Sequence, residues 1–121
     1  MSEQSRLDAL KAMAEKRPND AMVHYGLGSE YRKAGDLESA AAAFRVVIAN
    51  NPAYTAAFQE LGSVLVDLGR RDEAAAVLRD GVETADRTGA WKAREHMKRL
   101  LEGLEASTGE ACDPQPDGFC E

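Results

Sequence analysis

The sequence has few cysteines and few histidines, and each scarcity argues against a class of function. Both cysteines, Cys112 and Cys120, lie in the last ten residues, so we expect the fold to owe nothing to a disulfide. The two histidines, His24 and His96, have no Cys, Asp or Glu partner at an established metal-ligand or catalytic-triad spacing. The sequence also lacks a glycine-rich phosphate-binding loop. We therefore expect no enzymatic activity and no cofactor.

A surplus of positive charge and a long apolar run are missing as well. Fifteen basic and 21 acidic residues give a formal net charge of −6, whereas nonspecific nucleic-acid binding needs a basic face. No apolar run approaches the roughly 20 residues that cross a bilayer. The polar start, residues 1–5, has no apolar stretch typical of a secretory signal. These features predict a cytoplasmic protein that binds neither nucleic acid nor membranes.

What the sequence does have is the composition and periodicity of a single helical domain. Charged residues make up 30% of the 121 residues, and apolar side chains recur at three- and four-residue spacing. The pattern predicts six helices and hence an all-α fold. We place them at residues 5–17, 19–34, 37–50, 54–68, 72–85 and 89–106. Residues 107–121 have the composition of a flexible acidic tail.

The sequence also repeats itself at a shift of 34 residues. Leu27-Gly28-Ser29 falls on Leu61-Gly62-Ser63, Gly35 on Gly69, and Phe44 on Leu78. An internal period of this length is typical of helical solenoids. Within the repeat, Gly28 would let the following helix approach closely at Ala40, and Gly35 would end the first helix.

At these residues the sequence resembles the tetratricopeptide repeat family, whose 34-residue unit is a helix–turn–helix. The resemblance implies a short solenoid over residues 1–106. It would comprise an N-terminal capping helix at 5–17, repeats at 21–54 and 55–88, and a C-terminal capping helix at 89–106. The first helix looks like the second half of a repeat whose first half is missing. The last helix departs from the pattern, because Glu95 and His96 stand where Leu61 and Gly62 stood, and we expect Trp91 to shield the end of the core.

The resembled family is a scaffold for protein contacts, so we predict an adaptor that binds a protein or peptide. In that family the first helix of each repeat lines a concave groove for an extended peptide or a partner helix. Carried onto this register, the groove would present Met22, Tyr25, Ser29, Arg32 and Lys33, then Ala56, Gln59, Ser63, Val66 and Asp67. Arg94 and Met97 would close it if the last helix keeps the register. Some members grip a C-terminal carboxylate there. Of the corresponding positions only Arg94 fits, which speaks against that subclass.

Other interpretations remain open at this point. The groove residues could simply be exposed helix residues. The chain could be a self-associating structural module that forms a homo-oligomer. Cys112 and Cys120 could be two reduced thiols, a local disulfide, or half of a metal site shared between two chains. The sequence names no partner.

Overall fold

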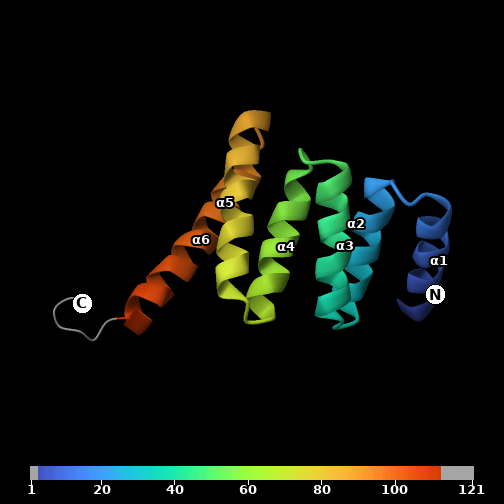
Figure 1. Ribbon diagram of the computed structural model, residues 1–121, viewed down its shortest axis with the longest axis horizontal. Coiled ribbons are helices and arrows are strands. Elements are labelled where there is room, and N and C mark those ends of the chain that lie inside the picture. Colours follow the sequence, from blue (N-terminus) through green and yellow to red (C-terminus); the bar gives the residue numbers. More distant parts are fainter. Residues whose placement is uncertain (1–2, 113–121) are drawn as a thin grey trace.

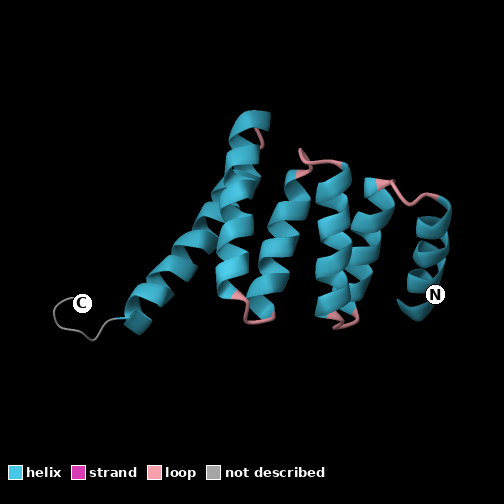
Figure 2. Cartoon of the chain, in the orientation of Figure 1, coloured by secondary structure: helices cyan, strands magenta, loops and turns pink. Residues whose placement is uncertain are grey.

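The computed structural model describes residues 3–112 and arranges them as a row of six helices. They are α1 (Glu3–Lys16), α2 (Ala21–Lys33), α3 (Leu37–Asn50), α4 (Thr55–Asp67), α5 (Arg71–Thr88) and α6 (Trp91–Cys112). Consecutive helices run antiparallel and pack on one another, and no strand occurs among the described residues (Figures 1 and 2). The predicted all-α fold is confirmed. We propose that the hairpins α2–α3 and α4–α5 are the two repeats and that α1 and α6 cap them.

Prolines and glycines end several of these helices. The helices α1 and α3 stop two residues before Pro18 and Pro52, because the residue preceding a proline is pushed out of helical angles. Gly35 and Gly69 adopt left-handed angles, with φ of +86° and +81°, just past α2 and α4. At the other end of α2, the Asp20 carboxylate accepts hydrogen bonds from the backbone N–H groups of the first turn.

Two helices are longer than the sequence predicted. Asp86 stands one period after Pro52 and does not interrupt the helix, so α5 continues to Thr88. Gly89, with φ of +78°, ends α5, whereas the sequence had assigned this glycine to the start of the last helix. The predicted end of α6 at residue 106 was also wrong. No proline occurs between Pro52 and Pro114, so none interrupts α6, which extends to Cys112. It crosses α5 at an angle (Figure 1). Residues 113–121 of the predicted tail lie outside the described residues.

The core runs from α3 to α6, with a smaller cluster between α1 and its neighbours. Its largest fully buried side chains are Phe44, Leu61, Leu65, Leu78 and Met97. Burying side chains of this size stabilises the fold by roughly 1.5–3 kcal/mol each. The smaller cluster is built from Leu7, Leu27 and Ala43, with Leu10, Ala14 and Tyr31 at its edge.

Met13 in α1 is more exposed than its equivalent in the later helices. Met13 follows Leu7 and Leu10 at three-residue spacing, which predicts a buried position, but it is 41% exposed. Its equivalent two periods later, Gly81, is buried between Phe58 of α4 and Met97 of α6. No helix precedes α1 in the described chain, so Met13 has packing neighbours on one side only.

Three glycines allow the helices to approach closely. A Cβ atom on Gly28 would lie 2.8 Å from Phe44 Cε1, and one on Gly62 would lie 2.5 Å from Leu78 Cδ2. The close approach predicted at Gly28 is therefore present, but its nearest neighbour is the Phe44 ring rather than Ala40. Gly81, which stands one period after Val47, is packed just as tightly. A Cβ there would lie 2.5 Å from Met97 Sδ and 2.8 Å from Phe58 Cβ.

We predict that Gly81→Ala lowers the free energy of unfolding by roughly 1–3 kcal/mol, the usual cost of overpacking. The new methyl would meet Phe58 Cβ, which cannot swing away by side-chain rotation. The matched control is Gly103→Ala in α6, where an added Cβ meets nothing within 4 Å. That change should stabilise the protein by about 0.5–1 kcal/mol, because glycine is a poor helix former. Urea unfolding of the two variants measures both effects, and a Gly81→Ala variant as stable as wild type would contradict the packing.

Candidate partner-binding surface

The predicted groove residues of α2 differ widely in exposure. Met22, in the first turn, is 74% exposed, and Lys33, the last residue, is exposed as well. Ser29 is half-buried between them. The two ends of this helix face, at Met22 and Lys33, are therefore accessible to a partner.

Tyr25 packs against the protein itself. Its ring stacks on Tyr54 with centroids 5.3 Å apart and meets the Phe44 ring edge-on at 5.6 Å. Burial raises the pKa of Tyr25 above its ordinary value, and Glu60 and Tyr54 raise it further, while Arg32 opposes them. Tyr25 thus ties α2 to α3 and to the turn that precedes α4.

Arg32 is already bound by acidic groups of its own chain. Its Nη1 lies 2.5 Å from Glu60 Oε1, and its Nη2 lies 3.8 Å from Asp67 Oδ2, both on α4. Lys33 Nζ lies 3.5 Å from Glu30 Oε2. Both residues were predicted to line the groove. In the structure Arg32 instead joins α2 to α4, and Lys33 pairs with the largely buried carboxylate of Glu30.

That carboxylate, Glu30, fixes α1 to α2. Its side chain is largely buried and accepts a hydrogen bond from Arg6 Nε at 3.2 Å. The bond from Arg6 lowers the pKa of Glu30, the charges of Arg6 and Lys33 lower it further, and burial opposes them. Arg6 stands 34 residues before Ala40 and 68 before Ala74, so it breaks a register that otherwise has a small residue here. The structure shows that this arginine replaces a small packing residue with an ion pair between helices.

The groove positions of α4 are half-buried, except Asp67, which is exposed. Val66 packs against the core, and Ser63 and Gln59 are partly accessible beside it. Met97 is a correction, because it is fully buried and cannot line a groove.

Met97 is buried because α6 is turned relative to the repeat register. One period after the buried Phe58, Leu61, Gly62 and Leu65 of α4 come Lys92, Glu95, His96 and Arg99. This polar set is exposed, and the helix instead turns its apolar set toward the core, including Met97, Leu100, Leu101 and Leu104.

The turn of α6 leaves an open hollow between α4 and α6, which we name the α4–α6 hollow. It has a volume of about 540 Å³ and is lined by Gln59, Trp91, Lys92, Ala93, Glu95, His96 and Arg99. Trp91 is 66% exposed there, so the expectation that it shields the core was wrong. The sequence placed Gln59 in the groove but not the other lining residues, because the groove positions of the last helix could be assigned only from the repeat register.

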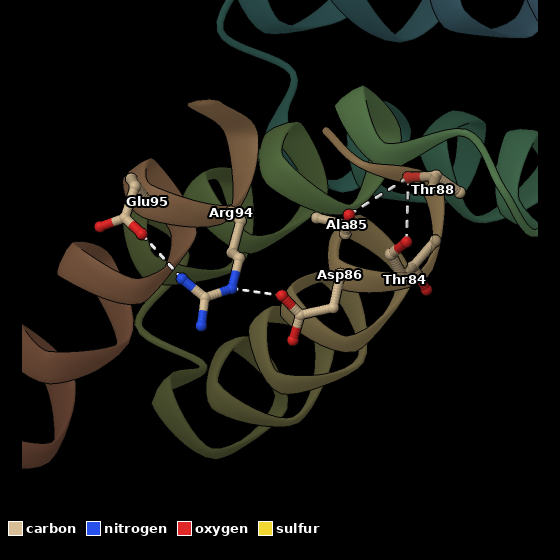
Figure 3. Close-up of polar contacts among 6 residues, drawn as sticks. All are labelled: Thr84, Ala85, Asp86, Thr88, Arg94 and Glu95. Atoms are coloured by element: carbon tan, nitrogen blue, oxygen red, sulfur yellow. Dashed lines mark hydrogen bonds and ion pairs between the residues drawn. The ribbon is translucent and has the colours of Figure 1, made fainter. Parts of the chain in front are cut away.

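Arg94, the last predicted groove residue, joins α6 to α5. Its guanidinium contacts the Asp86 carboxylate and also lies 2.7 Å from Glu95 Oε2 (Figure 3). On the neighbouring turns of α5 the hydroxyl of Thr88 donates to the carbonyl of Thr84 at 3.0 Å. Arg94 and Glu95 are therefore held by groups of their own chain rather than open to a partner.

Among the side chains that the structure describes, residues 5–105, no group of three or more His, Cys, Asp or Glu is placed to hold a metal ion. Among the described helices none is long and apolar enough to span a membrane. The predicted thiol or metal role of Cys112 and Cys120 falls on side chains outside the described residues.

We predict that Glu30→Gln weakens the protein at neutral pH and reduces its sensitivity to acid. Because the folded-state pKa of Glu30 is lowered, its contribution is present above the ordinary value near 4.5 and is lost as the pH falls through the folded-state value. Urea midpoints at a series of pH values measure this. The control is Glu38→Gln, which removes an exposed partner of Arg70 and should leave the acid limb close to wild type. Parallel acid limbs for Glu30→Gln and wild type would refute the role of Glu30.

Comparisons with known proteins agree with this fold. The tetratricopeptide repeat family matches residues 31–101, more than half of the chain. A TPR repeat-containing protein of Pseudomonas aeruginosa is 29% identical over 99 residues, which cover 82% of this chain and 94% of that protein. A crystal structure of a tetratricopeptide repeat domain protein from Salinibacter ruber has a TM-score of 0.68 at 25% identity, covering 72% of this chain and 97% of that one.

A more distant structure extends the likeness of fold. The TPR2B domain of yeast Sti1, solved in a complex with pHsp70, has a TM-score of 0.77 at 14% identity, covering 84% of this chain and 81% of that one. At this identity it supports the fold alone. Together with the family match and the glycine-packed hairpins, the fold leads to one conclusion: the chain belongs to the tetratricopeptide repeat family.

Proposed function

We propose that the protein is a non-catalytic interaction scaffold, an adaptor that binds a peptide or helix of a partner protein. The partner contacts the face formed by α2, α4 and α6, with the α4–α6 hollow as the main contact. One observation carries the proposal: the indole of Trp91 is 66% exposed beside an open hollow of about 540 Å³. An exposed tryptophan leaves much of its apolar area unburied in the monomer, and tryptophan is enriched among the residues that dominate binding energy.

The proposal moves the centre of the predicted groove from α2 toward α6. The side chains of Tyr25 and Arg32 already contact other residues of the chain. They therefore hold the helices that form the surface and do not contact the partner directly. Gln59 lies in the hollow, and Met22 remains exposed at the other end of the face. A bound segment would cross from the hollow past Ser63 toward α2.

The family supports the same class of function. Tetratricopeptide repeat domains are commonly protein-interaction modules, and the Sti1 domain was solved in a complex with pHsp70. We extend this class of role, but not that partner, to the present chain. A cytoplasmic address belongs to the same proposal.

We predict that Trp91→Ala abolishes the capture of a partner without lowering the melting temperature. Trp91 is exposed, so its truncation should remove little packing energy from the fold. Immobilised wild type, Trp91→Ala and Met13→Ala would each be used to capture proteins from lysate of the source organism, with identification by mass spectrometry. Met13→Ala is the control, since it truncates an exposed apolar side chain at the other end of the molecule. A partner retained equally by Trp91→Ala would contradict the proposal.

A further inference from the structure

Most arginines in the described part of the chain are matched with carboxylates. Arg32, Arg45, Arg79 and Arg94 each contact an acidic side chain of another helix. With 21 acidic and 15 basic residues, the chain has acids to spare for such pairing. Basic side chains with neither an ion pair nor a hydrogen bond are therefore the smaller group among the described residues.

Three such cations lie on α6. Among residues 5–105, the side chains of Lys92, Lys98 and Arg99 form no ion pair or hydrogen bond, and Lys11 and Lys16 in α1 are the other two, with the Lys11 ammonium over the Tyr31 ring. Lys92 and Arg99 line the α4–α6 hollow, whereas Lys98 does not. Two of the five unpaired cations are therefore brought together in the hollow.

The one acidic residue in the hollow offsets only part of this charge. Glu95 is paired with Arg94, which also contacts Asp86, as Figure 3 shows. No ion pair joins Glu95 to Lys92 or Arg99, and these two cations outnumber the single carboxylate of the lining. The hollow therefore presents more basic than acidic side chains on an acidic protein.

Trp91 adds an apolar surface to these cations. An indole offers a large flat face together with one N–H donor, so it suits an apolar side chain of a partner. Charges at the rim of an interface mainly steer encounter and select the partner, while buried aromatic anchors supply most of the affinity. The combination fits a segment that carries carboxylates next to an apolar residue.

A nucleic acid fits the same cations less well. Polyanion binding draws its affinity from many neutralised phosphates, and the hollow offers two unmatched cations on a chain with a net charge of −6. A short acidic segment of a protein needs only a few such contacts.

We infer that the α4–α6 hollow binds an acidic segment of a partner protein, with its carboxylates at Lys92 and Arg99 and an apolar side chain against Trp91. This inference rests on the proposed scaffold function and names the chemistry of the partner.

The single tryptophan of the chain makes the test direct, because binding in the hollow changes its fluorescence. The probe is a capped 12-residue peptide in which Asp and Glu alternate with Leu, compared with matched peptides carrying Lys or Gln in place of the acids. We expect the acidic peptide to shift Trp91 emission to the blue and to bind more weakly as salt rises. Arg99→Glu should weaken its binding by about tenfold. The control is Lys98→Glu, the same charge reversal one residue away and outside the hollow, which should retain most of the affinity.

Several results would overturn the inference. Equal binding of the Gln or Lys peptide would remove the acidic requirement, as would equal losses in Arg99→Glu and Lys98→Glu. If a single-stranded oligonucleotide binds more tightly than the acidic peptide, the hollow is a nucleic-acid site. If light scattering shows self-association that Arg99→Glu abolishes, the hollow binds a second copy of this chain. If partner capture still depends on Trp91 in any of these cases, the scaffold proposal stands and only the acidic partner is lost.

Discussion

The architecture depends on large side chains packed over glycines that have no Cβ. Phe44 lies over Gly28, Leu78 over Gly62, and Met97 beside Gly81, each closer than an added Cβ would allow. These contacts seat α3 on α2, α5 on α4 and α6 on α5. These contacts fix the positions of the helices relative to one another. The orientation of the exposed faces of α2, α4 and α6, and so the position of any binding surface, therefore follows from core packing.

The third of these contacts differs from the first two, and this difference creates the α4–α6 hollow. In the hairpins α2–α3 and α4–α5 the glycine lies on the first helix and the bulky residue on the second. At the end of the array Gly81 lies on α5 and Met97 on α6, so the roles of the two helices are exchanged. Burying Met97 turns α6 and exposes the polar positions His96 and Arg99, which the repeat register assigns to the interior. A capping helix therefore becomes the most distinctive surface of the molecule.

The periodic features were predictable from the sequence, and the features that break the period were not. The glycine stops at Gly35 and Gly69 and the proline stops of α1 and α3 act through local backbone geometry, so the residues alone revealed them. The binding of Arg32 by Glu60 and Asp67 joins residues that only the folded chain brings together. The exposure of Trp91 and the burial of Met97 depend on how α6 rotates, and that rotation is decided by the packing of several helices at once.

The rotation of α6 is the claim on which the proposed binding surface rests, and thiol labelling tests it most directly. In a background where Cys112 and Cys120 are replaced by serine, single cysteines would be introduced as His96→Cys and Met97→Cys, and circular dichroism would confirm that both variants are folded. The structure predicts that the cysteine at position 96 reacts with a soluble thiol reagent about as fast as a free thiol. The cysteine at position 97 should react far more slowly, because its side chain is reached only by local opening. Faster labelling at position 97 than at position 96 would show that α6 keeps the regular repeat register, and it would contradict the rotation.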